Sequence, residues 1–290
     1  MTPATVLYHD RCPDGFAAAL AARMVYGEAA RCIGASHGDA LPEIDGGTVY
    51  VLDFAYPLEA MQAIVRQAER LVWLDHHASV LDTAAALRAW LDREGLSKGA
   101  EIVLDMDRSG ATLAWNHFFP GQPVPKLIRH VEDRDLWRWR LPETPGYTSA
   151  LDDLPFDFAL WRELLERHEE DGGAYAEFVR IGQIGQNKYL KLCEQIAEKA
   201  EPIVIDSIAG LQVNASGEFA SQVGNILAAR SGTFALIWHV KDGMVRLSFR
   251  GTADFDVIPL AQKYGGGGHR AAAGARVPLA RLAEVLGQTG

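Results

Sequence analysis

The sequence predicts an α/β protein: a mostly parallel sheet with helices on both faces, then a helical connector and a smaller mixed α/β domain. In the first half, short apolar runs alternate with helical patterns, which is typical of parallel sheets. Residues 156–200 keep a helical periodicity with no strand signal. Strand-like runs return after Pro202. We therefore expect domains at 1–155 and 201–290, joined by a connector at 156–200.

Length and composition indicate a globular protein without a membrane segment. The chain has 290 residues, 48% of them hydrophobic and 23% charged, which suffices for one large domain or two ordinary ones. No apolar run approaches the ~20 residues that span a bilayer. The 3 cysteines are too few and too scattered for a disulfide framework or a zinc knuckle. These features predict a cytoplasmic protein.

The net charge narrows the choice of partner. At −10, the chain is poorly suited to long duplex nucleic acid, because that affinity comes mostly from lysine and arginine contacts to phosphates. A small phosphorylated substrate, held by metal ions and a few arginines, stays compatible with this charge. A homodimer is also compatible with the sequence.

The elements of the first half follow from short local patterns. An alanine-rich run at 16–22 has high helix propensity, and Pro57 fits the first turn of a helix that reaches about residue 69. Two more helices are expected at 109–117 and 126–132. The expected strands, each a short apolar run, are 5–9, 48–52, 71–74 and 101–104.

The second half repeats the strand signal in a different arrangement. Lys241-Asp242-Gly243 is a plausible hairpin turn between two strands, and helices are expected at 221–229 and 258–264. The expected strands are 203–205, 211–214, 234–239 and 244–249.

Ionisable residues collect at four points where the predicted elements of the first half end. These residues are His9, Asp10 and Asp14; Asp53; Asp75, His76 and His77; and Asp133 and Asp135. Neighbouring carboxylates repel one another unless a cation lies among them, and a mixture of aspartate and histidine suits Mn²⁺, Zn²⁺ or Fe²⁺. So many ligands could hold two ions, the arrangement that activates water against phosphate esters. Taken singly, Asp10, Asp14 and Asp53 could instead be helix caps or turn formers, and His9 a core histidine.

A glycine run near the C-terminal end is the second candidate site. Residues Gly265, Gly266, Gly267 and Gly268 leave backbone N–H groups free to approach an anion, and His269 and Arg270 add donors. Arg250, at the end of a predicted strand, could clamp a phosphate with its planar fork. The alternative for the glycines is a flexible loop or a helix stop.

These motifs resemble those of a known family. The Asp75-His76-His77 triplet, Asp53 and the Asp133 segment are similar to the motifs of the DHH phosphoesterases. The stretch from Gly265 to Gly274 resembles the signature of their associated C-terminal substrate-binding domain. The resemblance implies a two-domain, Mn²⁺-dependent phosphohydrolase with its active site between the domains. Its members include single-strand exonucleases, dinucleotide phosphodiesterases, and pyrophosphatases or polyphosphatases.

The resemblance also implies roles for individual residues. Asp53 would bridge two metal ions, and His76 and Asp133 would be ligands, with Asp135 replacing Asp133 if the alignment slips by two. His9 and Asp14 are the ligand candidates of the first motif. Asp75 would orient the site and His77 would face the substrate phosphate. In the second domain, His269 and the adjoining glycines would hold a phosphate, supported by Arg250 and Arg270.

The first motif departs from the family pattern at Cys12. Members often carry two aspartates in alternate positions before the glycine, whereas this chain has Cys12 where one of them is usual. A thiolate there would favour Zn²⁺ or Fe²⁺ over Mn²⁺. The alternative, a buried cysteine that binds no metal, is equally open. The role of Asp10 is undecided.

Residues and resemblance together predict an enzyme that hydrolyses phosphodiester bonds in short oligonucleotides or dinucleotides. Two alternatives stay open: an anhydride hydrolase acting on pyrophosphate or polyphosphate, and a non-catalytic nucleotide-binding protein. Trp137 and Trp139 could stack a base, although paired tryptophans more often close a domain core.

Overall fold

The computed structural model describes residues 4–36 and 38–287, in two compact units, Met1–Gln186 and Asn187–Gly290. Each unit has its own sheet and its own hydrophobic cores. The long helix α8 (Gly172–Ala197) contributes residues to both units. Within the described part of the chain, we find no helix with the length and apolar character needed to span a membrane.

The first unit is built on a parallel sheet, as predicted. Its strands are β1 (Ala4–His9), β2 (Ala30–Ala35), β3 (Thr48–Leu52), β4 (Arg70–Asp75) and β5 (Ala100–Leu104). They lie in the order β2-β1-β3-β4-β5, and every neighbouring pair is parallel. The strand order reverses between β1 and β3, and in open α/β sheets ligands bind where the carboxyl ends meet at such a reversal.

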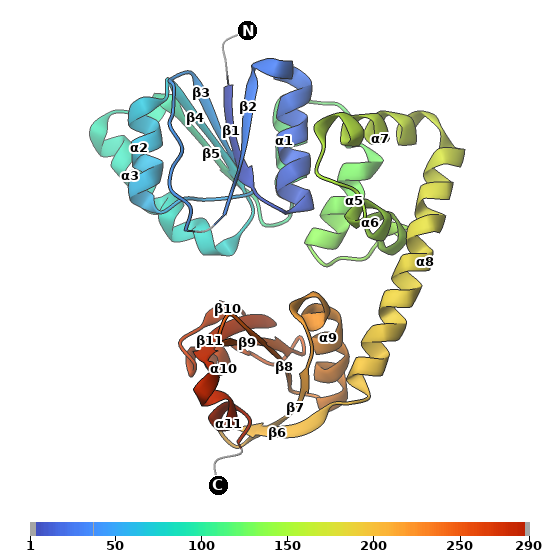
Figure 1. Cartoon of the computed structure of the whole chain (residues 1–290). Helices are drawn as coiled ribbons and strands as arrows, with labels where there is room; N and C mark the ends of the chain where they lie inside the picture. Colours follow the sequence, from blue (N-terminus) through green and yellow to red (C-terminus); the bar gives the residue numbers. More distant parts are fainter. Residues whose placement is uncertain (1–3, 37, 288–290) are drawn as a thin grey trace. The chain divides into compact units, whose positions relative to one another are not determined.

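Helices cover both faces of this sheet, which confirms the predicted fold class. They are α1 (Pro13–Tyr26), α2 (Leu58–Gln67), α3 (Leu81–Glu94), α4 (Gly110–Phe118), α5 (Lys126–Asp135), α6 (Thr144–Asp152) and α7 (Phe158–Glu170). One core joins the sheet to α1, α4, α5 and α7, and a second core joins it to α2 and α3. In Figure 1, α2 and α3 accordingly lie on the side of the sheet opposite α1.

Strand β2 was missing from the sequence prediction. Its residues, Ala-Arg-Cys-Ile-Gly-Ala, include few of the β-branched and aromatic side chains that mark a strand. The segment is extended because it pairs in parallel with β1, where Val6 faces Cys32. Tertiary pairing therefore outweighs weak local propensity at this edge of the sheet.

The second unit is a smaller mixed domain, also as predicted. Its strands are β6 (Glu201–Ile205), β7 (Ile208–Asn214), β8 (Phe234–Lys241), β9 (Met244–Gly251), β10 (Gly267–His269) and β11 (Ala272–Pro278). Their order is β10-β11-β9-β8-β7-β6, with β7 and β8 parallel and the other neighbours antiparallel. Helix α9 (Ala220–Ser231) packs on one face, and α10 (Ile258–Gln262) and α11 (Leu282–Val285) pack on the other. Asp242 and Gly243 form the predicted hairpin turn, both with positive φ.

Candidate active site

Ionisable residues from several elements meet at the carboxyl edge of the first sheet. His9 ends β1, Asp53 follows β3, and His76 follows β4, so these three residues come from neighbouring strands. Asp14 begins helix α1, and Asp135 is the last residue of α5. Residues that lie far apart in the sequence therefore form one cluster because parallel strands end at a common edge.

Asp53 lies at the centre of the cluster. Its Oδ1 is 3.1 Å from His76 Nε2, and its Oδ2 is 3.4 Å from His9 Nδ1. Asp53 is 1% exposed and has φ of 55°, an unusual conformation for a residue with a side chain. Its buried Oδ2 accepts no hydrogen bond from any described residue. A buried carboxylate oxygen without a donor suits a cation.

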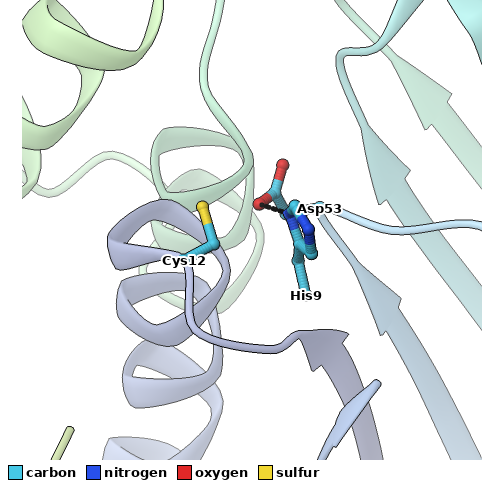
Figure 2. Close-up of side chains that lie close together, drawn as sticks. All are labelled: His9, Cys12 and Asp53. Atoms are coloured by element: carbon cyan, nitrogen blue, oxygen red, sulfur yellow. Dashed lines mark ion pairs between the residues drawn. The ribbon is translucent and has the colours of Figure 1, made fainter. Parts of the chain in front are cut away.

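Three overlapping groups of metal-ligand type lie at this edge, and one of them consists of Asp53, His76 and His77. The His9 group consists of His9, Cys12 and Asp53, and Figure 2 shows these three side chains together. The His76 group consists of Asp14, His76 and Asp135. Within each group the ligand atoms lie within 4.8 Å of one another. We call the six residues of the His9 group and the His76 group the Asp53 site: His9, Cys12, Asp14, Asp53, His76 and Asp135.

The N-terminus of helix α4 holds Asp14 in place. The backbone N–H groups of Gly110 and Ala111 donate to the Asp14 carboxylate at 2.6 and 3.0 Å. Position 110 requires glycine, because an added Cβ would lie 2.5 Å from Asp53 Cβ and 2.9 Å from Asp14 Oδ2. The sequence had suggested a helix start at Ser109, but its contact with Asp14, almost a hundred residues earlier, carries no local signal.

Asp75 contacts the backbone and the ring of its neighbours. Its fully buried Oδ1 accepts hydrogen bonds from the N–H groups of His76 and His77 at 2.7 and 3.1 Å. The same oxygen lies 2.7 Å from His77 Nδ1. With Nδ1 as the donor, Nε2 of His77 is the ring nitrogen left for a substrate, and this side chain is 35% exposed. This geometry suits a carboxylate that orients His77.

Burial and mutual repulsion perturb the ionisation of the site. Burial, together with the charges of Asp53 and Asp135, raises the pKa of Asp14 well above its usual value. Burial and the charge of Asp53 likewise raise the pKa of Asp135. Burial would lower the pKa of His76, but Asp53, Asp14 and Asp135 outweigh it and raise that pKa to about 9. Three carboxylates around one imidazole therefore favour any bound positive charge, whether protons or metal ions.

The structure separates Asp133 from Asp135. Asp133 accepts hydrogen bonds from the N–H groups of Arg140 and Leu141 at 2.8 and 3.0 Å, and from Thr144 Oγ1 at 2.6 Å. Asp135 Oδ2 instead lies 3.4 Å from His76 Nε2. Side chains two positions apart on a helix are separated by about 200° around the helix axis. Asp133 and Asp135 therefore cannot both face the site. Asp135 lies in the cluster with His76, and Asp133 does not.

The remaining two residues of the first motif lie differently. Cys12 is inside the His9 group, and burial with the charges of Asp53 and Asp14 raises the pKa of its thiol. A metal ion would be needed to hold it as a thiolate at neutral pH. Asp10 lies outside both groups, and its carboxylate pairs with Arg11 at 3.5 Å.

The glycine run of the second unit forms a strand edge. Gly266 lies so close to β11 that an added Cβ would be 2.0 Å from Gly274 O, and Gly268 has φ of 147°. Gly267 and His269 belong to β10, and His269 is exposed. Arg270 is also exposed and donates weakly to Asp254 O at 3.3 Å.

A groove lies beside this run, with cationic residues that the sequence reading missed. It has a volume of 460 Å³ and is lined by Gly265, Gly266, Ser248, Arg246 and Arg276, among others. Arg250 is absent from its lining; this guanidinium donates to Phe249 O and Ser221 Oγ at 2.9 and 3.0 Å. Alternation along β9 puts Arg246 on the same face as Ser248, which is the signal that could have identified it.

Comparison with known proteins was made for the whole chain. Residues 201–288 match the DHHA1 domain family. This match covers the predicted signature in the second unit, and the Asp75-His76-His77 triplet stands at the predicted strand end in the first. The second unit therefore carries a DHHA1 domain, and the motifs of the first unit resemble those of the DHH phosphoesterases.

Solved structures with a similar architecture include those of three different proteins. An exopolyphosphatase-related protein from Bacteroides fragilis has a TM-score of 0.56 at 13% identity, covering 99% of this chain and 91% of that one. The pGpG-specific phosphodiesterase PggH from Vibrio cholerae has a TM-score of 0.50 at 13% identity, covering 98% and 96%. RecJ with Mn²⁺ from Thermus thermophilus has a TM-score of 0.52 at 12% identity, covering 99% and 51%. At these identities the likeness shows a shared fold.

One relative by sequence comes from a virus. An uncharacterized protein of Acanthamoeba polyphaga mimivirus is 28% identical over 296 residues, covering 93% of this chain. The chain spans 66% of the length of that relative.

Proposed function

We propose that this chain is a metal-dependent phosphohydrolase that cleaves phosphodiester bonds in short oligonucleotides or dinucleotides. The observation that carries the proposal is the Asp53 carboxylate, which directs one oxygen toward His9 and the other toward His76. Divalent ions bound there would supply Lewis-acid activation of water and neutralise charge on the phosphate. The DHHA1 match over residues 201–288 and the resemblance of the first unit to DHH phosphoesterases support the same reaction class.

The proposed metal ligands are the six residues of the Asp53 site. His9 and Cys12 would serve one ion, Asp14, His76 and Asp135 the other, and Asp53 both. Two Mn²⁺ ions fit the family, whereas the thiol of Cys12 also suits Zn²⁺ or Fe²⁺. Asp133 leaves the proposed ligand set because its carboxylate already accepts three hydrogen bonds.

His77 is the residue that we place against the substrate phosphate. Its hydrogen bond to Asp75, more than any other interaction, raises its pKa. A protonated imidazole can donate from Nε2 to a phosphoryl oxygen and offset the negative charge that grows there. Asp75 holds the His77 ring in one orientation, so that Nε2 already faces the position proposed for the phosphate.

The second unit would supply the substrate-binding surface, as the family resemblance implies. Phosphate oxygens could bind to the exposed side chains of His269 and Arg270. They could also bind to Arg246 and Arg276, which line the groove beside the glycine run. The net charge of −10 favours short substrates over long duplexes. One of the similar solved structures is a pGpG-specific phosphodiesterase, which supports a dinucleotide substrate.

An anhydride hydrolase is the second candidate, because another structural neighbour is described as exopolyphosphatase-related. To separate the two, the purified chain is assayed with Mn²⁺ against a dinucleotide, pyrophosphate and polyphosphate, alongside metal analysis. We expect faster turnover of the dinucleotide. Hydrolysis of pyrophosphate or polyphosphate alone would favour the anhydride hydrolase. If none of the three substrates is hydrolysed, the remaining alternative is a non-catalytic nucleotide-binding protein. A cytoplasmic location and a homodimer stay predictions from the sequence.

A further inference from the structure

The loop after helix α5 carries two tryptophans in an unusual backbone conformation. Trp137 and Trp139 have φ of 53° and 52°, in the left-handed region that bulky residues rarely adopt. Such a conformation is unfavourable for a residue with a side chain and persists only where surrounding contacts impose it. Because two such residues, Trp137 and Trp139, lie within three positions, surrounding contacts must hold this loop in one defined conformation.

Asp133 imposes this shape from the side of the helix. Its backbone carbonyl accepts from the N–H groups of Arg138 and Trp139 at 2.8 and 3.3 Å. Its carboxylate then accepts from Arg140 and Leu141 further along the same loop. A buried aspartate that resembled a metal ligand in the sequence therefore organises the tryptophan loop.

Arg138 fixes the loop from the other side. This residue stands between the tryptophans, and its Nη2 donates to Asp107 O at 2.7 Å while Nη1 lies 3.6 Å from Glu132. Glu132 also accepts from the Ser109 N–H at 3.1 Å, immediately before the two N–H groups that hold Asp14. The loop is thus joined through hydrogen bonds to the same helix end that positions the Asp53 site.

The result is an exposed indole two residues after the proposed ligand Asp135. Trp137 is 51% exposed, whereas Trp73 and Trp161 are 0% and 1% exposed, so Trp137 does not close a core. Its ring meets Trp139 edge to face at 5.0 Å, which leaves at least one face of Trp137 uncovered by its partner. Asp135 is only two residues away, so the two Cα atoms are separated by at most about 7.6 Å.

We propose that Trp137 is a stacking platform for a nucleobase of the substrate, so that it selects nucleotides over base-free phosphates. The inference rests on the proposed function of the Asp53 site, which would act on the phosphate joined to that base. A base and its phosphate are linked through one sugar, so a platform beside the metal ligands meets the base of a flanking nucleotide. Every base has a π-face, so the platform is tolerant of sequence.

The test compares wild type with Trp137→Leu and Trp137→Phe on three substrates: a dinucleotide and two analogues, each lacking one base. Stacking on an aromatic side chain predicts that Trp137→Leu raises KM for the dinucleotide roughly 5- to 150-fold. For one abasic analogue, KM should be the same in wild type and variant, since the stacked base is absent. Trp137→Phe should recover part of the dinucleotide affinity. An equal rise in KM on all three substrates, or an unchanged KM for the dinucleotide, would overturn the platform.

Equilibrium binding separates a failed platform from a failed proposed function. If wild type hydrolyses no phosphodiester, dinucleotide binding to wild type and Trp137→Leu is measured by calorimetry. Weaker binding by the variant, with unchanged binding of one abasic analogue, supports the platform although the enzymatic proposal has failed. Equal dinucleotide affinity in both proteins contradicts the platform.

Discussion

The first unit contains two buried clusters of ionisable side chains, and they differ in charge. One cluster holds neutral histidines and the other holds interacting carboxylates and imidazoles. In the His130 cluster, His130 contacts Thr144 Oγ1 and the Tyr175 hydroxyl at 2.9 and 2.8 Å, and His168 contacts the Tyr147 hydroxyl at 2.9 Å. Burial lowers the pKa of both histidines to about 4, so they are neutral at pH 7. Neutral groups with hydrogen-bond partners stabilise a fold.

The Asp53 site gathers like charges instead. Burial and repulsion between carboxylates raise the pKa values of Asp14 and Asp135, whereas His76 and His9 outweigh burial and lower the pKa of Asp53 to about 2. Such an arrangement costs stability in the absence of a cation. Perturbed pKa values occur in both clusters, so perturbation alone does not mark function. What distinguishes the Asp53 site is that several carboxylates, imidazoles and a thiol of metal-ligand type lie together in it.

The largest effect is expected for Asp53→Asn. Loss of the carboxylate that faces both ligand groups should lower kcat with Mn²⁺ at least ~1000-fold. Because Asp53 repels Asp14 and Asp135 but pairs with His9 and His76, the melting temperature in EDTA should change little. Kinetics and thermal melting measure the two effects. Asp10→Asn is the matched control, since Asp10 lies outside both groups, and it should keep activity. An active Asp53→Asn would remove the two-ion proposal.

A smaller loss is expected for Asp75→Asn. Groups that orient a functional side chain typically contribute about 10- to 100-fold to activity. The hydrogen bond from His77 to Asp75 raises the pKa of His77, so its loss lowers that pKa. Activity that needs protonated His77 should then decline at lower pH than in wild type. The pH profile of kcat tests this, and an unshifted profile with reduced activity would assign Asp75 a purely structural role.

Cys12→Asp should change metal preference more than total activity. Replacing a soft sulfur ligand with oxygen should raise the ratio of Mn²⁺- to Zn²⁺-supported activity about 10-fold. Cys32→Ser offers a control, because Cys32 is a half-buried cysteine that belongs to neither ligand group. If both variants keep the wild-type ratio, Cys12 is a buried residue that binds no metal.

The smallest effect on activity, and a distinct effect on stability, is expected at the His130 cluster. The folded-state pKa of about 4 lies below the unfolded value, so the unfolded chain binds more protons between pH 4 and 6.5. Stability from these histidines is complete above pH 6.5 and is lost as pH falls to about 4, by on the order of 1–3 kcal/mol per histidine. Urea unfolding at pH 7 and 4.5 measures this loss. The double variant His130→Gln, His168→Gln should lose less stability on acidification; an identical loss would contradict the neutral-histidine assignment.

Local sequence patterns predicted most of the architecture. Alternating apolar runs and helical periods identified the parallel sheet, its covering helices and the mixed second domain, which the structure confirms. Strand β2 was not predicted, because its pairing with β1, rather than its own residues, makes it extended. The convergence of His9, Asp53 and His76 was predictable, because neighbouring parallel strands end at one edge.

Contacts distant in sequence decided the rest. The choice between Asp133 and Asp135 depends on the helical phase of α5 against β4, and the Asp14 carboxylate depends on Gly110. Composition and strand ends alone determined that acidic and imidazole groups would gather at one sheet edge. Tertiary structure decided which of them face each other, because orientation and burial arise only when separate elements pack together.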